Sequence, residues 1–583
     1  MKRVLTISLG PVQGFIATAR KTRDLWGGSY ILSSLSKAAA KALVEESSVE
    51  VIFPGLDSPS RLDEESFSVA NVIVCVFDDD NGDSPNVLVE KAKGAVRDRW
   101  EQLVAKARDK AKEKIGSDFL TFVRRDFWEE QTRFDDLVEF CAAWTPLDEN
   151  DVGRSISRAA KLLAGRKNCR EFSQPNYDGT GVPKSSLDGA RESVLSKELV
   201  QGDSERCDRA RDRLMIRKGE QLDAIGLIKR LLYKGSYRSL MEIAIQPRLK
   251  QEGLFDDSIV KNMVEEALEK ADFLSDLTNL NGDESLFKLS KLAKKIDEEG
   301  LYVALLLADG DKMGATLSSL KTIDARREFS IALSKFSGGV KNLVEKCDGE
   351  LVYAGGDDVM AFLPVDQAVG CANELRLWFE TSMIKYPETS LSVGIAIVHY
   401  REALDESLDF ARSAEKVAKS PNRIKLRDDP RYGDRNGLAI GLTTRGNVAK
   451  FIRERWEPRA RNGAETSSEL PSLAERLRDW GDAFAAGLLP SRFPYELYEL
   501  AASNVYAKKQ WRDDETLTQA LRADAKGVAT RKEGLDLTQG IGLKIDARLR
   551  EVSDPADLER FANEMVVAKK IADYRDSESK ENK

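Results

Sequence analysis

Three aspartates in the central part of the sequence have the surroundings expected of metal ligands. Asp309 follows the apolar run 302–308, which is typical of a strand buried on both faces. Asp357 and Asp358 end the sequence Gly-Gly-Asp-Asp between two short apolar runs, and this pattern is typical of a hairpin turn. Because neighbouring strands lie about 4.8 Å apart, carboxylates at their ends can share one cation.

Carboxylate oxygens of this kind suit Mg²⁺ or Mn²⁺, which keep their other positions for water and nucleotide phosphates. Two such ions can align the attacking and leaving oxygens of a phosphoryl transfer. We therefore predict that a ribose hydroxyl attacks the α-phosphate of a nucleoside triphosphate and that pyrophosphate leaves. Either motif alone is weak support, and the prediction rests on both occurring in order within one topology.

Residues beside these aspartates are candidates for further contacts. Gly310, Gly355 and Gly356 flank them and are predicted to lie against a bound nucleotide. Asp311 allows two interpretations: it is a further metal ligand, or it caps a helix that begins near Met313, and capping is favoured.

A basic face is expected on the last helix of this region. Arg412, Lys416 and Lys419 recur at positions i, i+4 and i+7, so they share one side of that helix. Such a face can hold a triphosphate, or it can simply be solvated. Lys419 is the strongest candidate for a phosphate contact.

The composition excludes several classes of protein. The single histidine, His399, rules out mechanisms that need several imidazoles, and a structural role is expected for it. The six cysteines form no CxxC pair, and no apolar stretch is long enough to span a membrane, so we expect a cytoplasmic protein. With 90 basic and 98 acidic residues, the net charge of −8 leaves RNA binding to local basic patches.

The elements around the aspartates are expected in the order β-α-β-β-α-β. Apolar runs predict strands at 302–308, 351–354, 359–364 and 391–398, and periodic segments predict helices at 324–346, 366–384 and 404–419. This order is the ferredoxin-like arrangement, which is also the palm of many polymerases and cyclases.

The length of 583 residues exceeds what one hydrophobic core usually supports, so an α+β multidomain chain is expected. An α+β module occupies 1–140, and a mainly helical linking domain with a Gly/Pro-rich loop occupies 141–290. The Gly-Gly-Asp-Asp palm occupies 291–425. A helical C-terminal domain, periodic from about 448 and ending in a polar tail expected to be disordered, occupies 426–583.

Four blocks of sequence resemble the large subunit of type III-B (Cmr-type) CRISPR effector complexes. They are GPVQGFIATARKTRDLWGGSYILSSL near the N-terminus, then ADGDKMG, LVYAGGDDVMAFLP and GIAIVHY. The blocks are long and ordered, and the resemblance spans roughly 4–445.

The resemblance implies two ferredoxin-like palm domains, the first of them inactive, with helical linking and C-terminal domains. It implies that pairing of guide RNA with target RNA activates the second palm to join ATP into cyclic oligoadenylates, with other complex subunits as partners. The three aspartates would bind the metals. The two palms would face each other across the nucleotide site, so residues of the first helices would border the second nucleotide: Gln13, Arg20, Arg23, Asp24 and Ser29. Taken alone, those helices are equally typical of a charged interdomain face.

The sequence departs from many relatives in two respects. Many carry an N-terminal HD nuclease domain, whereas here the palm-like module begins at residue 1, so DNA cleavage by this subunit is expected to be absent. Many also hold zinc through four cysteines between the palms, but that region offers only Cys141, Cys169 and Cys207. Zinc is therefore not expected.

Other functions are compatible with the same motifs. The palm could transfer AMP to an acceptor other than ATP, because the metals act on the phosphate and not on the acceptor. The chain could also be an idle scaffold that holds RNA and neighbouring subunits. A free-standing diguanylate-type cyclase is disfavoured by the large helical domains and the N-terminal block.

Overall fold

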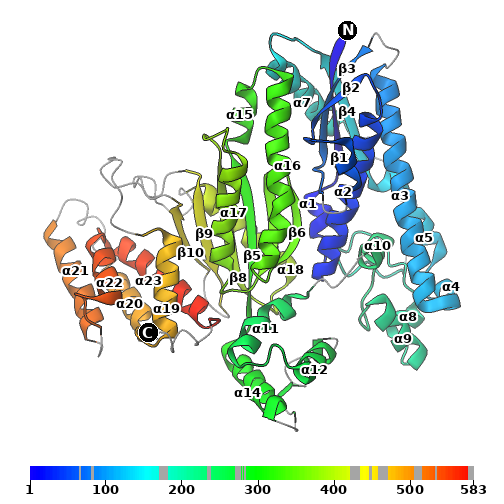
Figure 1. Ribbon diagram of the computed structural model, residues 1–583. Coiled ribbons are helices and arrows are strands. Elements are labelled where there is room, and N and C mark those ends of the chain that lie inside the picture. Colours follow the sequence, from blue (N-terminus) through cyan, green and yellow to red (C-terminus); the bar gives the residue numbers. More distant parts are fainter. Residues whose placement is uncertain are drawn as a thin grey trace.

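The structure is a computed structural model (Figure 1). It describes residues 1–64, 67–79, 84–169, 181–232, 238–268, 277–278, 280, 284–420, 434–444, 449–456, 471–504, 515–531 and 535–575. Within this part of the chain, no helix combines the length and the apolar character needed to cross a membrane. The expected disordered tail from residue 576 lies outside the described residues.

The N-terminal domain is a four-stranded antiparallel sheet with the strand order β2-β3-β1-β4. Its elements are β1 (Lys2–Gly10), α1 (Gln13–Ala17), α2 (Thr22–Val44), β2 (Val49–Phe53), β3 (Val72–Asp78), α3 (Pro85–Ile115), α4 (Phe119–Phe122), α5 (Arg125–Gln131), α6 (Phe134–Leu137) and β4 (Glu139–Pro146), with 3-10 helices at Pro59–Asp63 and Gly116–Asp118. Alternation along β1 sends Leu5, Ile7 and Leu9 into the main core, while Val4 joins a smaller core on the other face.

The palm that carries the Gly-Gly-Asp-Asp sequence is a six-stranded sheet with the strand order β10-β9-β8-β5-β7-β6. Its elements are β5 (Tyr302–Asp311), α15 (Met313–Ser319), α16 (Ile323–Lys346), β6 (Glu350–Gly355), β7 (Asp358–Leu363), α17 (Ala368–Ser382), β8 (Ser390–His399), α18 (Leu404–Lys419), β9 (Gly437–Leu442) and β10 (Lys450–Arg455). The order β8-β5-β7-β6 repeats the order β4-β1-β3-β2 of the N-terminal domain. The prediction of two ferredoxin-like domains in an α+β chain is therefore confirmed.

The structure differs from the expected helical segment after residue 448. Lys450–Arg455 is a strand, β10, that pairs with β9 and extends the palm sheet well beyond residue 425. The sequence KFIRER does not show the apolar pattern of a buried strand, because Arg453 and Glu454 are buried with polar partners. Arg453 donates to the carbonyl of Ala418 at 3.1 Å, and Glu454 forms an ion pair with Arg476 at 2.9 Å.

A turn separates the first two helices. α1 ends at Ala17 and α2 runs from Thr22 to Val44. The carboxylate of Asp24 accepts a hydrogen bond from the backbone N–H of Lys21 at 3.2 Å, which caps the start of α2. The chain therefore turns between the two helices.

The linking region divides between the two palms. Its helices are α7 (Val152–Asn168), α8 (Lys197–Gln201), α9 (Glu205–Leu214), α10 (Ala224–Leu232), α11 (Leu240–Gln251), α12 (Ser258–Leu268) and α14 (Glu284–Glu299). α10 packs against α2 and α3 of the N-terminal domain, whereas α11 packs against β5 and β7 of the palm. Figure 1 shows α10 and α11 below the two domains that they contact.

The C-terminal helices pack on the β10 edge of the palm through α19 and α23 (Figure 1). They are α19 (Leu473–Ala485), α20 (Phe493–Ser503), α21 (Glu515–Thr530), α22 (Gly540–Arg550) and α23 (Pro555–Ala572). After α23, the hydroxyl of Tyr574 accepts a hydrogen bond from the backbone N–H of Tyr302 at 2.6 Å. This contact links the residues that follow α23 to the start of β5.

The two palm-like domains contact each other reciprocally. α2 of the N-terminal domain packs against β6 of the palm, and α16 of the palm packs against β2 of the N-terminal domain. Because α2 corresponds to α16 and β2 to β6 in the two similar folds, these two contacts are equivalent. A cavity lies between them, bordered by the ends of β5 and β7.

Candidate active site between the two palms

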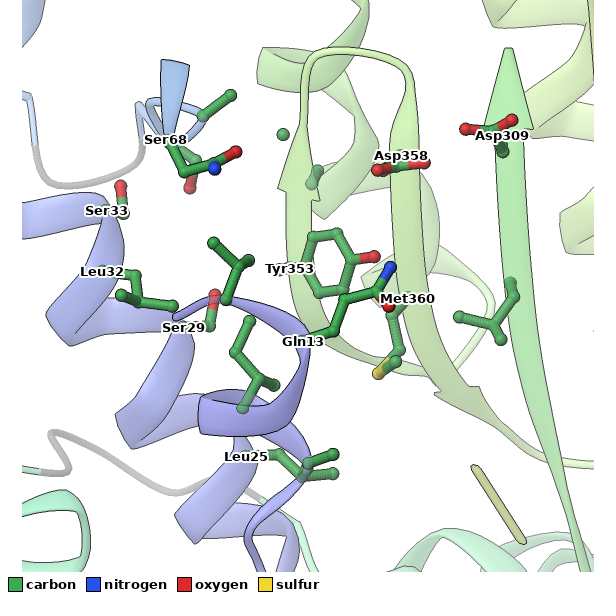
Figure 2. Close-up of a pocket in the computed structure, with 18 of the residues that line it drawn as sticks. Gln13, Leu25, Ser29, Leu32, Ser33, Ser68, Asp309, Tyr353, Asp358 and Met360 are labelled. Carbon is green, nitrogen blue, oxygen red and sulfur yellow. The ribbon is translucent and has the colours of Figure 1, made fainter. Parts of the chain in front are cut away.

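The pairing of β5 with β7 places two of the predicted aspartates side by side. The ladder pairs Ala308 with Val359, so the next position sets Asp309 opposite Asp358. Directly opposite residues of antiparallel strands point to the same face of the sheet. Figure 2 shows both carboxylates on neighbouring strands, at the same level of the cavity.

The third aspartate, Asp357, lies against Gly310 on the neighbouring strand. A Cβ added to Gly310 would be 2.7 Å from both Cβ and Oδ2 of Asp357, so this position has no room for a side chain. Burial and the charge of Asp358 raise the pKa of Asp357 to about 7, and burial raises the pKa of Asp358 to about 6. Carboxyls crowded in this way favour a bound cation.

The glycines before these aspartates form the hairpin turn. Gly355 pairs with Asp358 at the end of the β6–β7 ladder, and Gly356 adopts a φ of +67°. This left-handed conformation suits glycine, as the turn pattern in the sequence predicts. Gly355 also lines the cavity, so the turn brings backbone as well as carboxylates to its wall.

The cavity has a volume of about 490 Å³, within the range of small-ligand sites. The palm contributes one wall, which includes Asp309, Asp358, Tyr353 and Met360. The N-terminal domain contributes the opposite wall, whose described polar residues are all uncharged: Gln13, Ser29, Ser33, Ser36, Ser68 and Asn71. Apolar side chains such as those of Leu25 and Leu32 complete that wall (Figure 2).

The basic face of α18 is only partly directed into the cavity. Arg412 and Lys419 are the cations among the described lining residues, whereas Lys416 is exposed and lies outside the lining. Lys419 forms ion pairs with Asp309 and with Glu415, the latter at 2.9 Å. Burial, together with the charge of nearby Arg435, lowers the pKa of Lys419 to about 8.

Two of the five N-terminal candidates reach the cavity. Gln13 and Ser29 line it (Figure 2), but Arg20, Arg23 and Asp24 do not.

The side chains of Arg23 and Asp24 face the linking domain instead. Asp24 is fully buried and accepts two hydrogen bonds from Arg230 of α10, at 2.9 and 3.0 Å. Arg23 contacts the side chain of Met215, and Arg20 is exposed. The structure therefore supports the alternative interpretation of this segment, an interdomain face, for Arg23 and Asp24.

Asp311 is neither a helix cap nor open to the cavity. The residue before α15 is Lys312, in a left-handed conformation and without a capping side chain. The carboxylate of Asp311 is buried and accepts hydrogen bonds from Ser390, Ser392 and the backbone N–H of Asn436, at 2.7 to 2.9 Å. The capping interpretation is wrong, because these partners from β8 and the start of β9 engage the carboxylate instead.

Several lining residues were missed by the sequence analysis. Ser33 and Ser36 lie at i+4 and i+7 from the predicted Ser29 on α2, a same-face spacing that could have identified them. Asn71 lies opposite Leu9, one position beyond the last pair of the β1–β3 ladder, where the palm has Asp358 and Asp309. The matching strand ends of the N-terminal domain therefore lack the carboxylate pair.

The donor set fits a magnesium-type ion and no soft metal. Among the described residues, no group of three or more histidines, cysteines or acids is arranged around one point to hold an ion. Two facing carboxylates nevertheless match the way Mg²⁺ is usually bound, with water and phosphate oxygens as its other ligands. His399 is buried against Tyr302 at the start of β5, the opposite end of that strand from Asp309. The expectation that zinc is absent stays a prediction.

Comparisons with known proteins agree with this architecture. Residues 302–427 match the family model described as Cas10/Cmr2, second palm domain, and residues 4–105 match CRISPR-associated protein Cmr2, N-terminal. The curated Pyrococcus furiosus protein "CRISPR system Cmr subunit Cmr2" is 28% identical, over 78% of this chain and 63% of its own length. The chain thus spans less than two thirds of that relative.

Two solved structures share the fold. A chain of the type III-B Cmr-beta complex in its apo state superposes with a TM-score of 0.64 at 13% identity, over 91% of this chain and 77% of that chain. A chain of the same type of complex bound to cognate target RNA gives 0.62 at 14% identity, over 93% and 80%.

The fold and site define a two-palm protein with one palm carrying the Gly-Gly-Asp-Asp hairpin. Two parts of the chain match Cas10/Cmr2 family domains, and its fold is similar to that of chains from type III-B complexes. The resemblance inferred from the sequence is confirmed in this respect. The expected absence of an HD nuclease domain stays a prediction.

Proposed function

We propose that this chain is the nucleotide-polymerising subunit of a type III CRISPR effector complex. Pairing of guide RNA with target RNA activates the palm, which joins ATP into cyclic oligoadenylates. The other subunits of the complex and the two RNAs are its partners. The proposal places this activity in the cytoplasm, where ATP and transcripts meet, and assigns no DNA cleavage to this subunit.

The observation that carries the proposal is the facing pair Asp309 and Asp358 in a cavity that also presents Arg412 and Lys419. Acids and cations together suit a nucleoside triphosphate with its metal ions. Asp309 and Asp358 would hold Mg²⁺ or Mn²⁺, with Asp357 beside them adding negative charge. When bound, such ions neutralise the phosphates and polarise the α-phosphate for attack.

Residues of the palm wall bind the triphosphate, and residues of the N-terminal wall bind the acceptor. Arg412 and Lys419 contact the triphosphate from α18, and Lys419 leaves Asp309 to do so. Gln13 and Ser29 hold the acceptor from the N-terminal wall. The acceptor's ribose hydroxyl then forms a bond to the α-phosphorus, the bond to the β-phosphate oxygen breaks, pyrophosphate departs, and the hydroxyl proton passes to solvent.

A second candidate is transfer of AMP to an acceptor that carries no triphosphate. It is favoured by the uncharged N-terminal wall, because the cations among the described lining residues both belong to α18 of the palm. A second triphosphate would find no positive partner on that wall. Hydroxyl and amide groups there suit a ribose or another neutral polar group.

Mass spectrometry of reaction products tests both candidates. The reconstituted complex is given ATP, Mg²⁺, target RNA and a cell-metabolite extract, and Asp309→Asn and Asp358→Asn are run beside it. Cyclic oligoadenylates that disappear in both variants support the main proposal, and an AMP conjugate that disappears supports the second candidate. Absence of any nucleotide product under all conditions leaves an idle scaffold as the function.

A further inference from the structure

Helix α10 of the linking region lies directly behind the N-terminal wall of the cavity. Every residue of this helix is buried, including Lys229 and Arg230, which are 1% and 0% exposed. Buried charges are costly unless they are fully hydrogen-bonded, so the partners of these two side chains identify what the helix holds.

Lys229 holds the end of α1. Its ammonium group donates to the carbonyl oxygens of Phe15 and Thr18, the latter at 3.1 Å, and lies 4.1 Å from the centre of the Phe15 ring. Ile16 and Ala17, between those two carbonyls, line the cavity. One buried amine thus fixes the backbone on both sides of a cavity-lining segment.

Arg230 holds the start of α2. Its guanidinium forms the two-bond pair with Asp24 and a further ion pair with Glu220 at 3.0 Å. The next residue, Leu25, lines the cavity, and Ser29 does so one turn later. Consecutive residues of α10 therefore anchor both helices of the N-terminal wall.

The contact between α10 and α2 is too close to allow a side chain. A Cβ added to Gly27 would lie 2.8 Å from the carbonyl carbon of Lys229, closer than van der Waals contact permits. Gly27 in the N-terminal sequence block is thereby explained by packing against α10, whereas a Cβ added to Gly28 would lie 3.3 Å from Cα of Ile16 in α1. The wall moves only if α10 moves with it.

The same stretch of chain is fixed to the palm a few residues later. The guanidinium of Arg238 donates to the carbonyls of Asp348 and Gly349, at 2.9 and 2.8 Å, and contacts Glu350 at the start of β6. α11 follows and packs against β5 and β7, the strands that carry Asp309 and Asp358. Arg230 and Arg238, which are close in sequence, therefore contact the two opposite walls of the cavity.

We propose that Lys229, Arg230 and Arg238 are positioning residues that set the separation of the two walls of the nucleotide cavity. Through them, the linking region determines how tightly the N-terminal wall engages the bound nucleotide. This inference rests on the proposed function for the identity of the ligand. None of the three residues touches the reacting atoms, so their loss weakens nucleotide binding more than it slows chemistry.

The test uses Lys229→Met and Arg238→Met in the reconstituted complex. Methionine keeps most of the lysine's volume but removes the charge, the two hydrogen bonds to the carbonyls of Phe15 and Thr18, and the contact of the ammonium group with the Phe15 ring. Arg238 is partly exposed, with 30% of its side chain accessible, so its variant keeps the test available if Lys229→Met fails to fold. Lys110→Met is the matched control, because Lys110 donates from α3 to the carbonyl of Leu231 on the outer side of the same helix.

Two quantities are measured: the dissociation constant of a non-hydrolysable ATP analogue, and KM and kcat for ATP. We expect both variants to raise the dissociation constant and KM about 5- to 10-fold while kcat changes less than about threefold, with the control unchanged. Wild-type values in both variants would overturn the inference, as would an equal effect of Lys110→Met. If the wild-type complex binds the analogue but forms no product, the proposed function fails while the binding constants still decide this inference.

Discussion

Lys419, at the end of α18, forms an ion pair with Asp309, at the end of β5, inside the cavity between the two palms. The carboxylate that a metal ion would need is thus paired with a lysine. Under the proposed function, binding of a metal with its nucleotide separates this pair, and the freed ammonium group then contacts a phosphate. Lys419 would in that case both compete with the metal for Asp309 and bind the substrate.

Lys419→Met is expected to bind Mn²⁺ more tightly in the absence of ATP but to turn ATP over less efficiently. Loss of a charged phosphate contact should lower kcat/KM about 10- to 100-fold, since each tenfold corresponds to about 1.4 kcal/mol. Calorimetry with Mn²⁺ and pyrophosphate release measure the two effects. Lys416→Met, on an exposed site of the same helix, is the control, and equal behaviour of the two variants would refute the assignment.

Asp311→Asn is expected to lower stability and to leave metal binding unchanged. Its carboxylate accepts hydrogen bonds from two buried or half-buried serines and a backbone N–H, so the amide loses charge-assisted bonds worth about 1.5–3 kcal/mol. Thermal unfolding and Mn²⁺ stoichiometry are the measurements. A normal melting temperature with loss of a metal equivalent would instead make Asp311 a ligand.

The Asp24–Arg230 pair predicts a pH-dependent stability. Burial alone would raise the pKa of Asp24, but the charge and hydrogen bonds of Arg230 and the N–H groups of Arg20 and Lys21 hold it below its ordinary value of 3.8. A lowered pKa adds stability that is complete above the unfolded-state value near 4 and is lost as the pH falls through the folded-state value.

Asp24→Asn should therefore destabilise the protein by about 3 kcal/mol at neutral pH, because Arg230 loses its main partner. The difference from wild type should shrink as the pH falls below about 4. Unfolding curves at several pH values measure this. Asp63→Asn removes an exposed pair with Lys41 and should cost less than about 1 kcal/mol, whereas a pH-independent effect of Asp24→Asn would contradict the account.

Gln13 and Arg20 lie in the same N-terminal sequence block, but only Gln13 lines the cavity, so their variants are expected to differ in nucleotide binding. Gln13→Ala should raise KM for the nucleotide about fivefold, as expected for one lost hydrogen bond of about 1 kcal/mol. Arg20→Ala should stay within twofold, because its side chain is exposed and outside the cavity lining. The opposite ranking in steady-state kinetics would show that the nucleotide lies nearer the turn between α1 and α2.

Much of the palm could be predicted from the sequence because its signals are local. The apolar run before Asp309 and the glycines before Asp357 each specify an element within a few residues, and strand pairing then brings the acids together. The order of elements was sufficient for the ferredoxin-like arrangement.

The residues that sequence reasoning misplaced depend on partners far along the chain. Asp24 pairs with Arg230, 206 positions away, and Asp311 accepts from the backbone of Asn436, 125 positions away. A charged residue near a motif looks the same in sequence whether it faces a ligand or a neighbouring domain. Strand β10 was missed for the same reason, since Glu454 is buried only because Arg476 meets it.

The most direct test of the account is pyrophosphate release from ATP by the reconstituted complex with target RNA, comparing Asp309→Asn and Asp358→Asn with Asp405→Asn, an exposed acid at the start of α18. The account predicts that each of the first two loses at least about 1000-fold, equivalent to roughly 4 kcal/mol, while the third retains wild-type activity. Wild-type pyrophosphate release by either cavity variant would contradict the facing carboxylates as the catalytic pair.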